Sequence, residues 1–283
     1  MRLYPCGNFF LSLPDDHKLP EIQKTHALYD RSYASILRPL SGWRPSGAIV
    51  DIGANVGDTA AFIRTHIGNP IVCVEGGNNF VTHLRHNARI IDDHNIHILD
   101  RFVAPDSKAH LPAAYVEKDG TGYLHLEGEG RVNFITTGDL LSFARDLGQG
   151  EIALLKSDTD GMDGLIIRDV INQDPDFAIH FECDYMVTQS LGRPDLWNSI
   201  FEDLERLGWS SIIFDNCGLP FMFMDKTSSS IIDNIQGWIH LQRQLGVVRT
   251  HYIDVFSFPP TARAVYDAAK SCIGDSFLQP YRY

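Results

Sequence analysis

The sequence predicts an α/β fold with a mostly parallel, doubly wound sheet. Apolar segments of four to six residues alternate with longer segments of helical character from residue 48 onward. Apolar runs of that length are typical of parallel strands covered by helices on both faces. The chain has 283 residues, 44% of them hydrophobic, which is enough to bury the core that such a sheet needs. No repeat of fixed period interrupts this pattern.

We divide the chain into an N-terminal helical cap (residues 1–45) and one Rossmann-like domain (residues 46–283). The sequence of the cap predicts an irregular segment followed by one helix from Leu19 to Leu40, with Pro20 in the first turn of that helix. The expected strands of the domain are Ala48–Asp51, Ile71–Glu75, Ile96–Asp100, Ile152–Lys156, Phe177–Glu182, Ser211–Phe214 and His251–Phe258. The expected helices between them are Thr59–His66, Asn79–Ile91, Gly138–Leu147, Gly164–Asn172 and Leu196–Leu207.

Between residues 110 and 137 the pattern changes to short strands. Ala114–Glu117 and Gly122–Leu126 flank Asp119-Gly120, a pair of residues that is typical of a two-residue hairpin turn. A third short strand is expected at Val132–Thr136.

A glycine loop between the first strand of the domain and its helix predicts a nucleotide-like cofactor. Glycine lacks a Cβ, so the backbone N–H groups of such a loop can approach a ligand closely. Gly53 and Gly57 have the spacing GxxxG, and Asp58 begins a stretch that suits a helix N-cap. A dinucleotide fingerprint would need glycine at positions 55 and 58, where this chain has Asn55 and Asp58. A carboxylate there would repel a pyrophosphate.

S-adenosylmethionine fits the loop better, because it carries a sulfonium and an ammonium and no phosphate. Asp51 and Asp58 would favour such a cation, and Glu75, at the end of the next strand, can accept both ribose hydroxyls. Asp100, which ends the third strand, could reach the adenine or cap the next turn. The expected cofactor-binding residues are Asp51, Gly53, Ala54, Asn55, Gly57, Asp58, Thr59, Glu75 and Asp100.

Several motifs resemble those of the FkbM-like methyltransferases. Residues 50–59 resemble the first motif of that family, and Leu155–Gly161 resembles its second signature, Lys-x-Asp-x-Glu-Gly. Further segments fall in the family order, at Thr137–Leu141, Ile179–Glu182 and Tyr252–Phe256. The resemblance spans about residues 48–258. It implies a class I Rossmann-like methyltransferase fold, S-adenosylmethionine as donor and, usually, O-methylation of a hydroxyl on a sugar or another small natural product.

The chain departs from the family pattern at two places. Asp160 stands where the family has glutamate, and Gly76-Gly77 follows Glu75 where a proline is common.

The expected catalytic residues are Asp158 and Lys156. Lys156 ends the expected strand Ile152–Lys156, and Asp158 lies in the loop that follows it. Ligands of such sheets bind outside the carboxyl ends of the strands, so Asp158 could act as a general base or orient the acceptor. Lys156 could hold Asp158 or steady the acceptor oxygen; alternatively, the two form a structural ion pair. A magnesium ion (Mg2+) is possible but not favoured, with oxygen ligands from Asp158, Asp160, Glu182 and Asp184. His180, within an apolar strand, is expected to be a hydrogen-bonded core residue.

The composition limits the partners. A net charge of −12 without a basic stripe argues against nucleic acid, and no apolar run reaches the ~20 residues of a membrane span. Five cysteines without a CxxC pair suggest a reducing, cytoplasmic setting without disulfides. The expected partner is a small acceptor with a hydroxyl group. Two alternatives stay open: a non-catalytic S-adenosylmethionine-binding module and, less favoured, a nicotinamide-dependent oxidoreductase.

Overall fold

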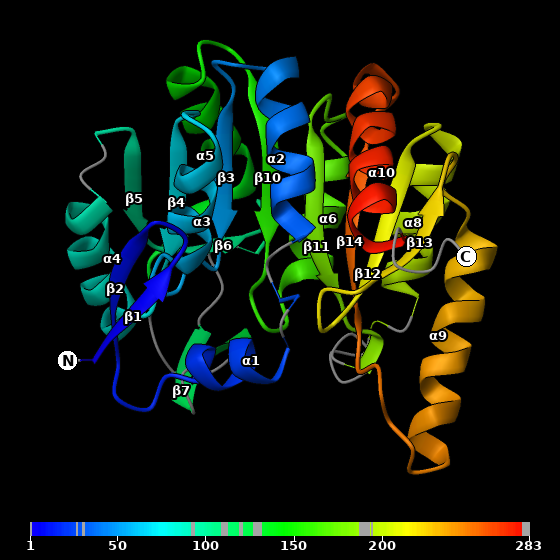
Figure 1. Ribbon diagram of the computed structural model, residues 1–283, viewed down its shortest axis with the longest axis horizontal. Helices are drawn as coiled ribbons and strands as arrows, with labels where there is room; N and C mark the ends of the chain where they lie inside the picture. Colours follow the sequence, from blue (N-terminus) through cyan, green and yellow to red (C-terminus); the bar gives the residue numbers. More distant parts are fainter. Residues whose placement is uncertain are drawn as a thin grey trace.

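An eight-stranded sheet in the order β13-β12-β14-β11-β10-β3-β4-β5 forms the centre of the computed structural model (Figure 1). The structure describes residues 2–26, 28–29, 32–91, 94–108, 113–118, 121–126, 132–186, 193 and 195–278. The strands of this sheet are β3 (Ala48–Ile52), β4 (Ile71–Glu75), β5 (Ile96–Asp100), β10 (Ile152–Ser157), β11 (Ala178–Cys183), β12 (Ser210–Asp215), β13 (Pro220–Met224) and β14 (Ile253–Phe258).

The sheet topology confirms the predicted fold class. Strands β5, β4, β3, β10 and β11 are parallel neighbours. Strand β14 lies antiparallel between β11 and β12, and β13 completes the edge as a hairpin with β12. The strand order reverses beside β3, and β14 is inserted antiparallel near the far edge, as in class I methyltransferase folds. Strand β13 is a second antiparallel strand, at the edge itself.

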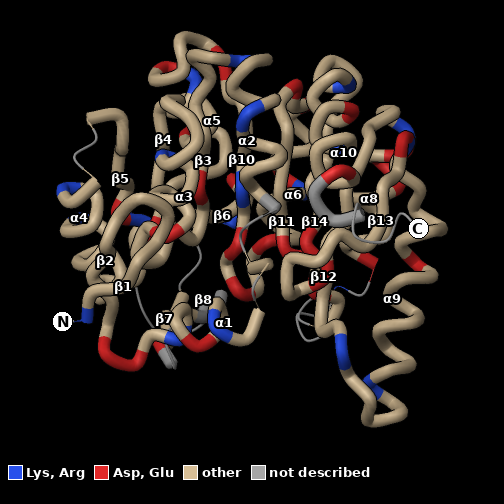
Figure 2. Tube along the Cα trace, in the orientation of Figure 1, with Lys and Arg blue, Asp and Glu red and all other residues tan. Residues whose placement is uncertain are grey.

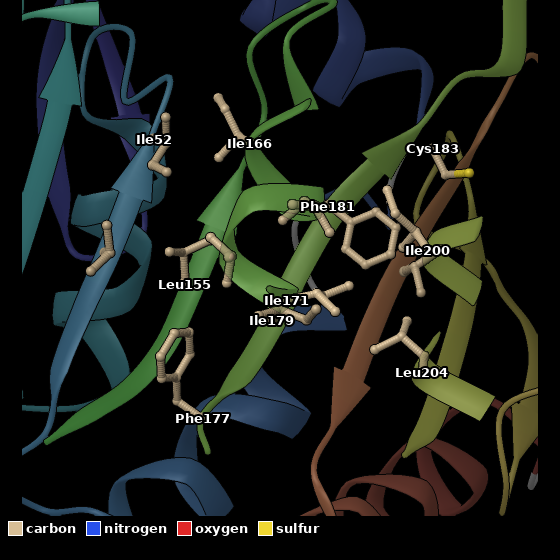
Figure 3. Close-up of a cluster of buried hydrophobic side chains, with 14 of the residues drawn as sticks. Ile52, Leu155, Ile166, Ile171, Phe177, Ile179, Phe181, Cys183, Ile200 and Leu204 are labelled. Atoms are coloured by element: carbon tan, nitrogen blue, oxygen red, sulfur yellow. The ribbon is translucent and has the colours of Figure 1, made fainter. Parts of the chain in front are cut away.

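Helices cover both faces of the sheet, which explains why its strands are mostly apolar. On one face lie α2 (Ser32–Trp43), α3 (Asp58–His66) and α10 (Arg263–Leu278), with their buried side chains in one core cluster. The other face is covered by α5 (Thr137–Leu147), α6 (Asp163–Ile171), α8 (Leu196–Arg206) and α9 (Ser229–Gln244). Figure 3 shows this second cluster, in which Ile200 of α8 lies near Phe181 of β11.

Strand alternation decides which polar side chains share a face. In β10, Leu155 belongs to the cluster under α6, whereas Leu154 belongs to the cluster under α2. Successive side chains of a strand point to opposite faces. Lys156 therefore points to the face covered by α2. The same alternation along β3 and β11 places Asp51 and His180 on that face.

The N-terminal residues differ from the expected single helix. They form a hairpin of β1 (Arg2–Cys6) and β2 (Phe9–Leu13), followed by α1 (Leu19–Thr25) and then α2. The prediction of one helix from Leu19 to Leu40 is wrong, because α1 ends at the extended backbone of His26. Pro20 does lie in the first turn of α1. The hairpin packs on α4 (Asn78–Ile91). Helix α2 buries four side chains in the core cluster on its face of the sheet: Tyr33, Ile36, Leu37 and Leu40.

Short strands form two small sheets near the carboxyl ends of the parallel strands. Strands β7 (Ala113–Lys118) and β8 (Thr121–Leu126) form the predicted hairpin, although its turn residues, Asp119 and Gly120, lie outside the described residues. Strands β6 (Phe102–Ala104) and β9 (Phe134–Thr136) pair in parallel. Figure 1 shows β7 and α1 beside the lower, carboxyl ends of β3 and β10.

Candidate functional site

Two adjoining cavities lie at the carboxyl ends of β3, β4 and β10. The first, the Glu75 cavity, has about 550 Å³ of empty space, and the second, the Glu182 cavity, has about 1200 Å³, both including their open mouths. Gly53, Asn55, Asp158 and Asp160 line both cavities. The two spaces therefore meet where the loop after β3 approaches the loop after β10.

That approach depends on Gly53. Its φ is +75°, and a Cβ at this position would overlap the backbone carbonyl of Asp158. Only glycine tolerates both conditions without strain. Gly57, with φ +86°, takes the N-cap position of α3, so the predicted N-cap at Asp58 is wrong: Asp58 is the first residue of the helix. A left-handed backbone at Gly57 turns the chain into the helix without a side-chain cap.

Glu75 is held in place by the loops on either side of it. One carboxylate oxygen accepts the N–H of Gly77 at 2.7 Å, and the other accepts the N–H of Asn55 at 2.9 Å. Burial raises the pKa of Glu75, and these backbone donors partly oppose that shift. Each oxygen keeps a further lone pair. The fixed carboxylate can therefore accept hydroxyl groups of a ligand in the Glu75 cavity.

An aromatic wall explains why two glycines follow Glu75. A Cβ at Gly76 would overlap the ring of Phe102, and a Cβ at Gly77 would overlap the hydroxyl of Tyr115. The two rings pack with centroids 5.0 Å apart and line the Glu75 cavity. Sequence reasoning missed both aromatic residues. The one sequence signal for these aromatic residues was the pair Gly76-Gly77, because two residues without side chains leave room for large neighbours.

The hydroxyl of Tyr115 is buried and has no hydrogen-bond partner among the described residues. Burial, followed by the charges of Glu75 and Glu117, raises the pKa of Tyr115 above its usual value. The phenol therefore keeps its proton and presents an unused donor at the wall of the cavity.

A buried ion triplet lies beneath the Glu182 cavity. The Nζ atom of Lys156 is 3.2 Å from Oδ1 of Asp51 and 3.2 Å from Oδ2 of Asp158. Burial lowers the pKa of Lys156, but Asp158 and Asp51 outweigh burial and raise it well above its usual value. Lys156 is therefore a permanent cation. Asp51 is fully buried and lines neither cavity, so the cation that it faces is this lysine.

Asp158 is the accessible member of the triplet, with 41% of its side chain exposed. The loop that carries it is anchored by Asp163, whose carboxylate accepts the hydroxyl of Ser157 at 2.6 Å and the N–H of Thr159 at 3.1 Å. Asp163 is a structural residue that sequence reasoning missed. Burial, together with Asp158 and Asp163, raises the pKa of Asp160 to about 8.

His180 is the core histidine that the sequence predicted. Its Nδ1 forms a hydrogen bond with the hydroxyl of Tyr33, and its ring stacks on Phe256 at a centroid distance of 4.0 Å. Burial and the charge of Lys156 lower the pKa of His180 well below its usual value. His180 is thus neutral and forms part of the floor of the Glu182 cavity.

The chain before α1 reaches over the glycine loop. Nδ1 of His17 accepts the N–H of Leu19 at 3.2 Å, so Nε2 carries the ring proton toward Oδ1 of Asn55, 3.1 Å away. Burial raises the pKa of Asp58, and the nearby His17 opposes that shift. Asp58 and Thr59 line the Glu182 cavity beside His17.

The structure does not bring all the predicted residues together. Asp100 is exposed, pairs with Arg85 at 2.9 Å and lines neither cavity. Asp158, Asp160 and Glu182 line one cavity, whereas Asp184 lies in a separate pocket and accepts the N–H of Met186. Within the described residues, no group of three or more His, Cys, Asp or Glu side chains is arranged to hold a metal ion.

Two further expectations concern membrane spans and disulfide bonds. Among the described residues, no helix has the length and apolar character that crossing a bilayer requires. None of the five cysteines is joined to another by a disulfide.

Comparison with known proteins gives only distant structural likenesses. No family model matches the chain, and no curated protein matches it either. Solved structures to which it is similar include a putative O-methyltransferase from Klebsiella pneumoniae, with 9% identity, 85% of this chain and 90% of that chain covered, and a TM-score of 0.41. An O-methyltransferase from Bacillus cereus in complex with SAH shares 11% identity over 87% of this chain and 92% of its own, with a TM-score of 0.39. Precorrin-6y C5,15-methyltransferase from Geobacter metallireducens GS-15 shares 13% identity over 78% of this chain and 84% of its own, with a TM-score of 0.37.

Proposed function

We propose that this chain is an S-adenosylmethionine-dependent methyltransferase of the FkbM-like type, which methylates a hydroxyl group of a sugar or another small acceptor. The observation that carries the proposal is the pair of adjoining cavities at the carboxyl ends of the strands. One holds the fixed carboxylate of Glu75, the other holds Lys156 and Asp158, and the two meet at Gly53. A donor and an acceptor could therefore lie side by side with their reacting groups close together.

The Glu75 cavity fits the nucleoside part of the donor. Glu75 would accept the ribose hydroxyls, and Phe102 and Tyr115 would pack against the purine, whose nitrogens could use the free hydroxyl donor of Tyr115. Asp58 would offer negative charge to the ammonium and sulfonium groups. Asp160, whose pKa is raised to about 8, would do so once it has lost its proton. When bound, S-adenosylmethionine supplies an electrophilic methyl group on a positively charged sulfur.

The residues around Asp158 suit the acceptor side of the reaction. Methyl transfer is a direct displacement, so the protein contributes mainly by orienting the acceptor oxygen and removing its proton. Asp158 is accessible and would accept that proton. Lys156, fixed between Asp51 and Asp158, would hold the Asp158 carboxylate in one orientation. Asp51 thus acts through Lys156, as a positioning residue.

Ligand-dependent stability tests the cofactor assignment. Thermal unfolding would be followed with S-adenosylhomocysteine, NAD and ATP, each added separately. A ligand that binds the folded state alone adds about 2.7 kcal/mol at 100 times its dissociation constant. We expect S-adenosylhomocysteine to raise the Tm and the other two ligands to leave it unchanged. Stabilisation by NAD without stabilisation by S-adenosylhomocysteine would contradict the proposal.

A further inference from the structure

Glu182 occupies an unusual place on the wall of the Glu182 cavity. In the antiparallel pair of β11 and β14 it lies directly opposite Asp254, and both residues line the cavity. Like charges at directly opposed positions of a sheet destabilise it. Two carboxyl groups therefore lie side by side at this point of the cavity wall.

Glu182 also lacks a compensating partner. Its carboxylate makes no hydrogen bond or ion pair with any residue that the structure describes, whereas Glu75 accepts two backbone N–H groups. Burial raises the pKa of Glu182 well above its usual value, and the charges of Asp158, Asp163 and Asp254 act in the same direction. A carboxylate that faces a cavity and is withdrawn from solvent is stabilised most by a cation.

The cavity as a whole is acidic. Its carboxylates come from five described residues: Asp58, Asp158, Asp160, Glu182 and Asp254. The basic residues of the described lining are fewer: Lys156, which already lies between Asp51 and Asp158, and Lys18 and His17, from the chain before α1. His180 also lines the cavity and is neutral. Figure 2 shows acidic residues gathered at the edge of the sheet below β10, β11 and β14. The described lining therefore attracts a cationic ligand and repels an anionic one.

Aromatic side chains line the same cavity as Glu182. Tyr252 precedes β14, and burial, Glu182 and Asp254 raise its pKa, so that it remains a neutral phenol. Phe214 of β12 lies opposite Asp254 and also lines the cavity. Aromatic faces attract ammonium groups, more strongly where water is excluded. Carboxyl groups and aromatic rings that line one cavity are suited to binding a protonated amine.

We propose that the methyl acceptor carries a protonated amine that binds at Glu182, on the wall formed by β11 and β14, while its hydroxyl group is directed toward Asp158. The acceptor class is accordingly an amino sugar or another amino alcohol. This inference rests on the proposed function, because it assigns the ligand of the same site. The charge-assisted hydrogen bond to Glu182 would fix the orientation of the acceptor.

Binding of matched probes tests the proposal. The protein, saturated with S-adenosylhomocysteine and kept in EDTA, would be titrated with ethanolamine, glucosamine and tyramine. The neutral counterparts would be ethylene glycol, glucose and 4-(2-hydroxyethyl)phenol. We expect at least one amine to bind ten times or more tightly than its counterpart. Glu182→Gln should abolish that preference, and Asp254→Asn should reduce it. Glu202→Gln, which changes an exposed glutamate of α8, should leave it intact.

The outcomes separate this inference from the proposed function. If S-adenosylhomocysteine binds but no amine is preferred over its counterpart, the amine site is wrong and the methyltransferase proposal stands. An amine preference that survives in both Glu182→Gln and Asp254→Asn also overturns the assignment. If S-adenosylhomocysteine itself fails to bind, the proposed function fails first. EDTA excludes a divalent cation as the source of any difference.

Discussion

At the scale of single residues, the site is organised by one buried lysine between two carboxylates. Lys156 and Asp51 are almost inaccessible to solvent, and Asp158 is exposed on the cavity side. Removing one partner of a buried ion pair leaves a charge in a medium that solvates it poorly. The inner and outer carboxylates therefore have different expected roles: Asp51 maintains the lysine, and Asp158 meets the acceptor.

Asp158→Asn tests the role of the outer carboxylate. The substitution keeps the shape of the side chain and removes its ability to take a proton, so kcat should fall by about 10²–10⁴-fold. The affinity for S-adenosylhomocysteine should change little. Methyl transfer from labelled donor measures the first quantity and calorimetry the second. Asp233→Asn, at an exposed position of α9, is the control. Unchanged turnover would refute the base assignment.

Lys156→Met tests the inner pair. The unfolding free energy should fall by about 3–5 kcal/mol, because Asp51 is left buried without a cation. Adding Asp51→Asn should recover part of that loss. Urea unfolding measures each variant. Lys270→Met removes a lysine from a surface pair with Asp225 and should have almost no effect. Equal effects of the two lysine substitutions would show that the buried pair has no special role.

At the scale of elements, the site is formed where the loops after β3 and β10 touch. The contact between Gly53 and the carbonyl of Asp158 joins the two signature motifs, which are about a hundred residues apart in the sequence. The sequence identified both motifs and their places at strand ends. It did not show that one glycine allows their contact, because a φ of +75° and a neighbouring carbonyl are properties of the folded backbone.

Gly53→Ala tests this contact between loops. The added Cβ would overlap the Asp158 carbonyl in a strained left-handed conformation, so we expect a loss of about 1–3 kcal/mol of stability and weaker binding of S-adenosylhomocysteine. Gly42→Ala, in α2, meets no atom within 4 Å and should be neutral or stabilising. Thermal unfolding with and without the ligand compares them. Equal ligand affinity in the two variants would contradict the role of Gly53.

How well each helix or strand could be predicted from the sequence depends on how deeply it is buried. The alternating strands and helices of the sheet domain were predicted because strands buried on both faces read as continuous apolar runs. The hairpin of β1 and β2, strand β13 and helices α9 and α10 were not predicted. Helix α9 carries exposed apolar residues, including Trp238 and Leu241, which obscure an amphipathic pattern. One helix was expected where α1 and α2 are separate, because the sequence between them lacks a strong breaker.

At the scale of the whole molecule, several buried carboxylates give the stability a common pH dependence. Burial, with Asp158 and Asp163, raises the pKa of Asp160 from an ordinary value of 3.8 to about 8. Burial also raises the pKa of Asp51, Glu75 and Glu182. The folded state binds these protons more tightly than the unfolded state does. Their contribution to stability is complete below the unfolded pKa and is lost as the pH rises through the folded pKa.

Asp160→Asn tests that dependence. In the unliganded wild-type protein, the unfolding free energy should decline as the pH rises from about 4 to about 8. One carboxyl group contributes at most about 1.4 kcal/mol per pH unit to this decline in unfolding free energy. The variant should show a shallower decline, since its amide does not titrate. Urea unfolding across that pH range measures both slopes. Identical slopes would show that Asp160 ionises normally.

The sequence by itself determined the sheet-and-helix order, the glycine loop, the carboxylate at the end of the second parallel strand and the Lys156–Asp158 motif. These are local features, in which spacing and residue type fix the chemistry. Only the tertiary structure decided that Asp51 faces Lys156, that Phe102 and Tyr115 wall the Glu75 cavity, and that Glu182 lies opposite Asp254. Each of these depends on strand order and register, which join segments far apart in the chain. Strand alternation shows which side chains share a face, but not which neighbours they meet there.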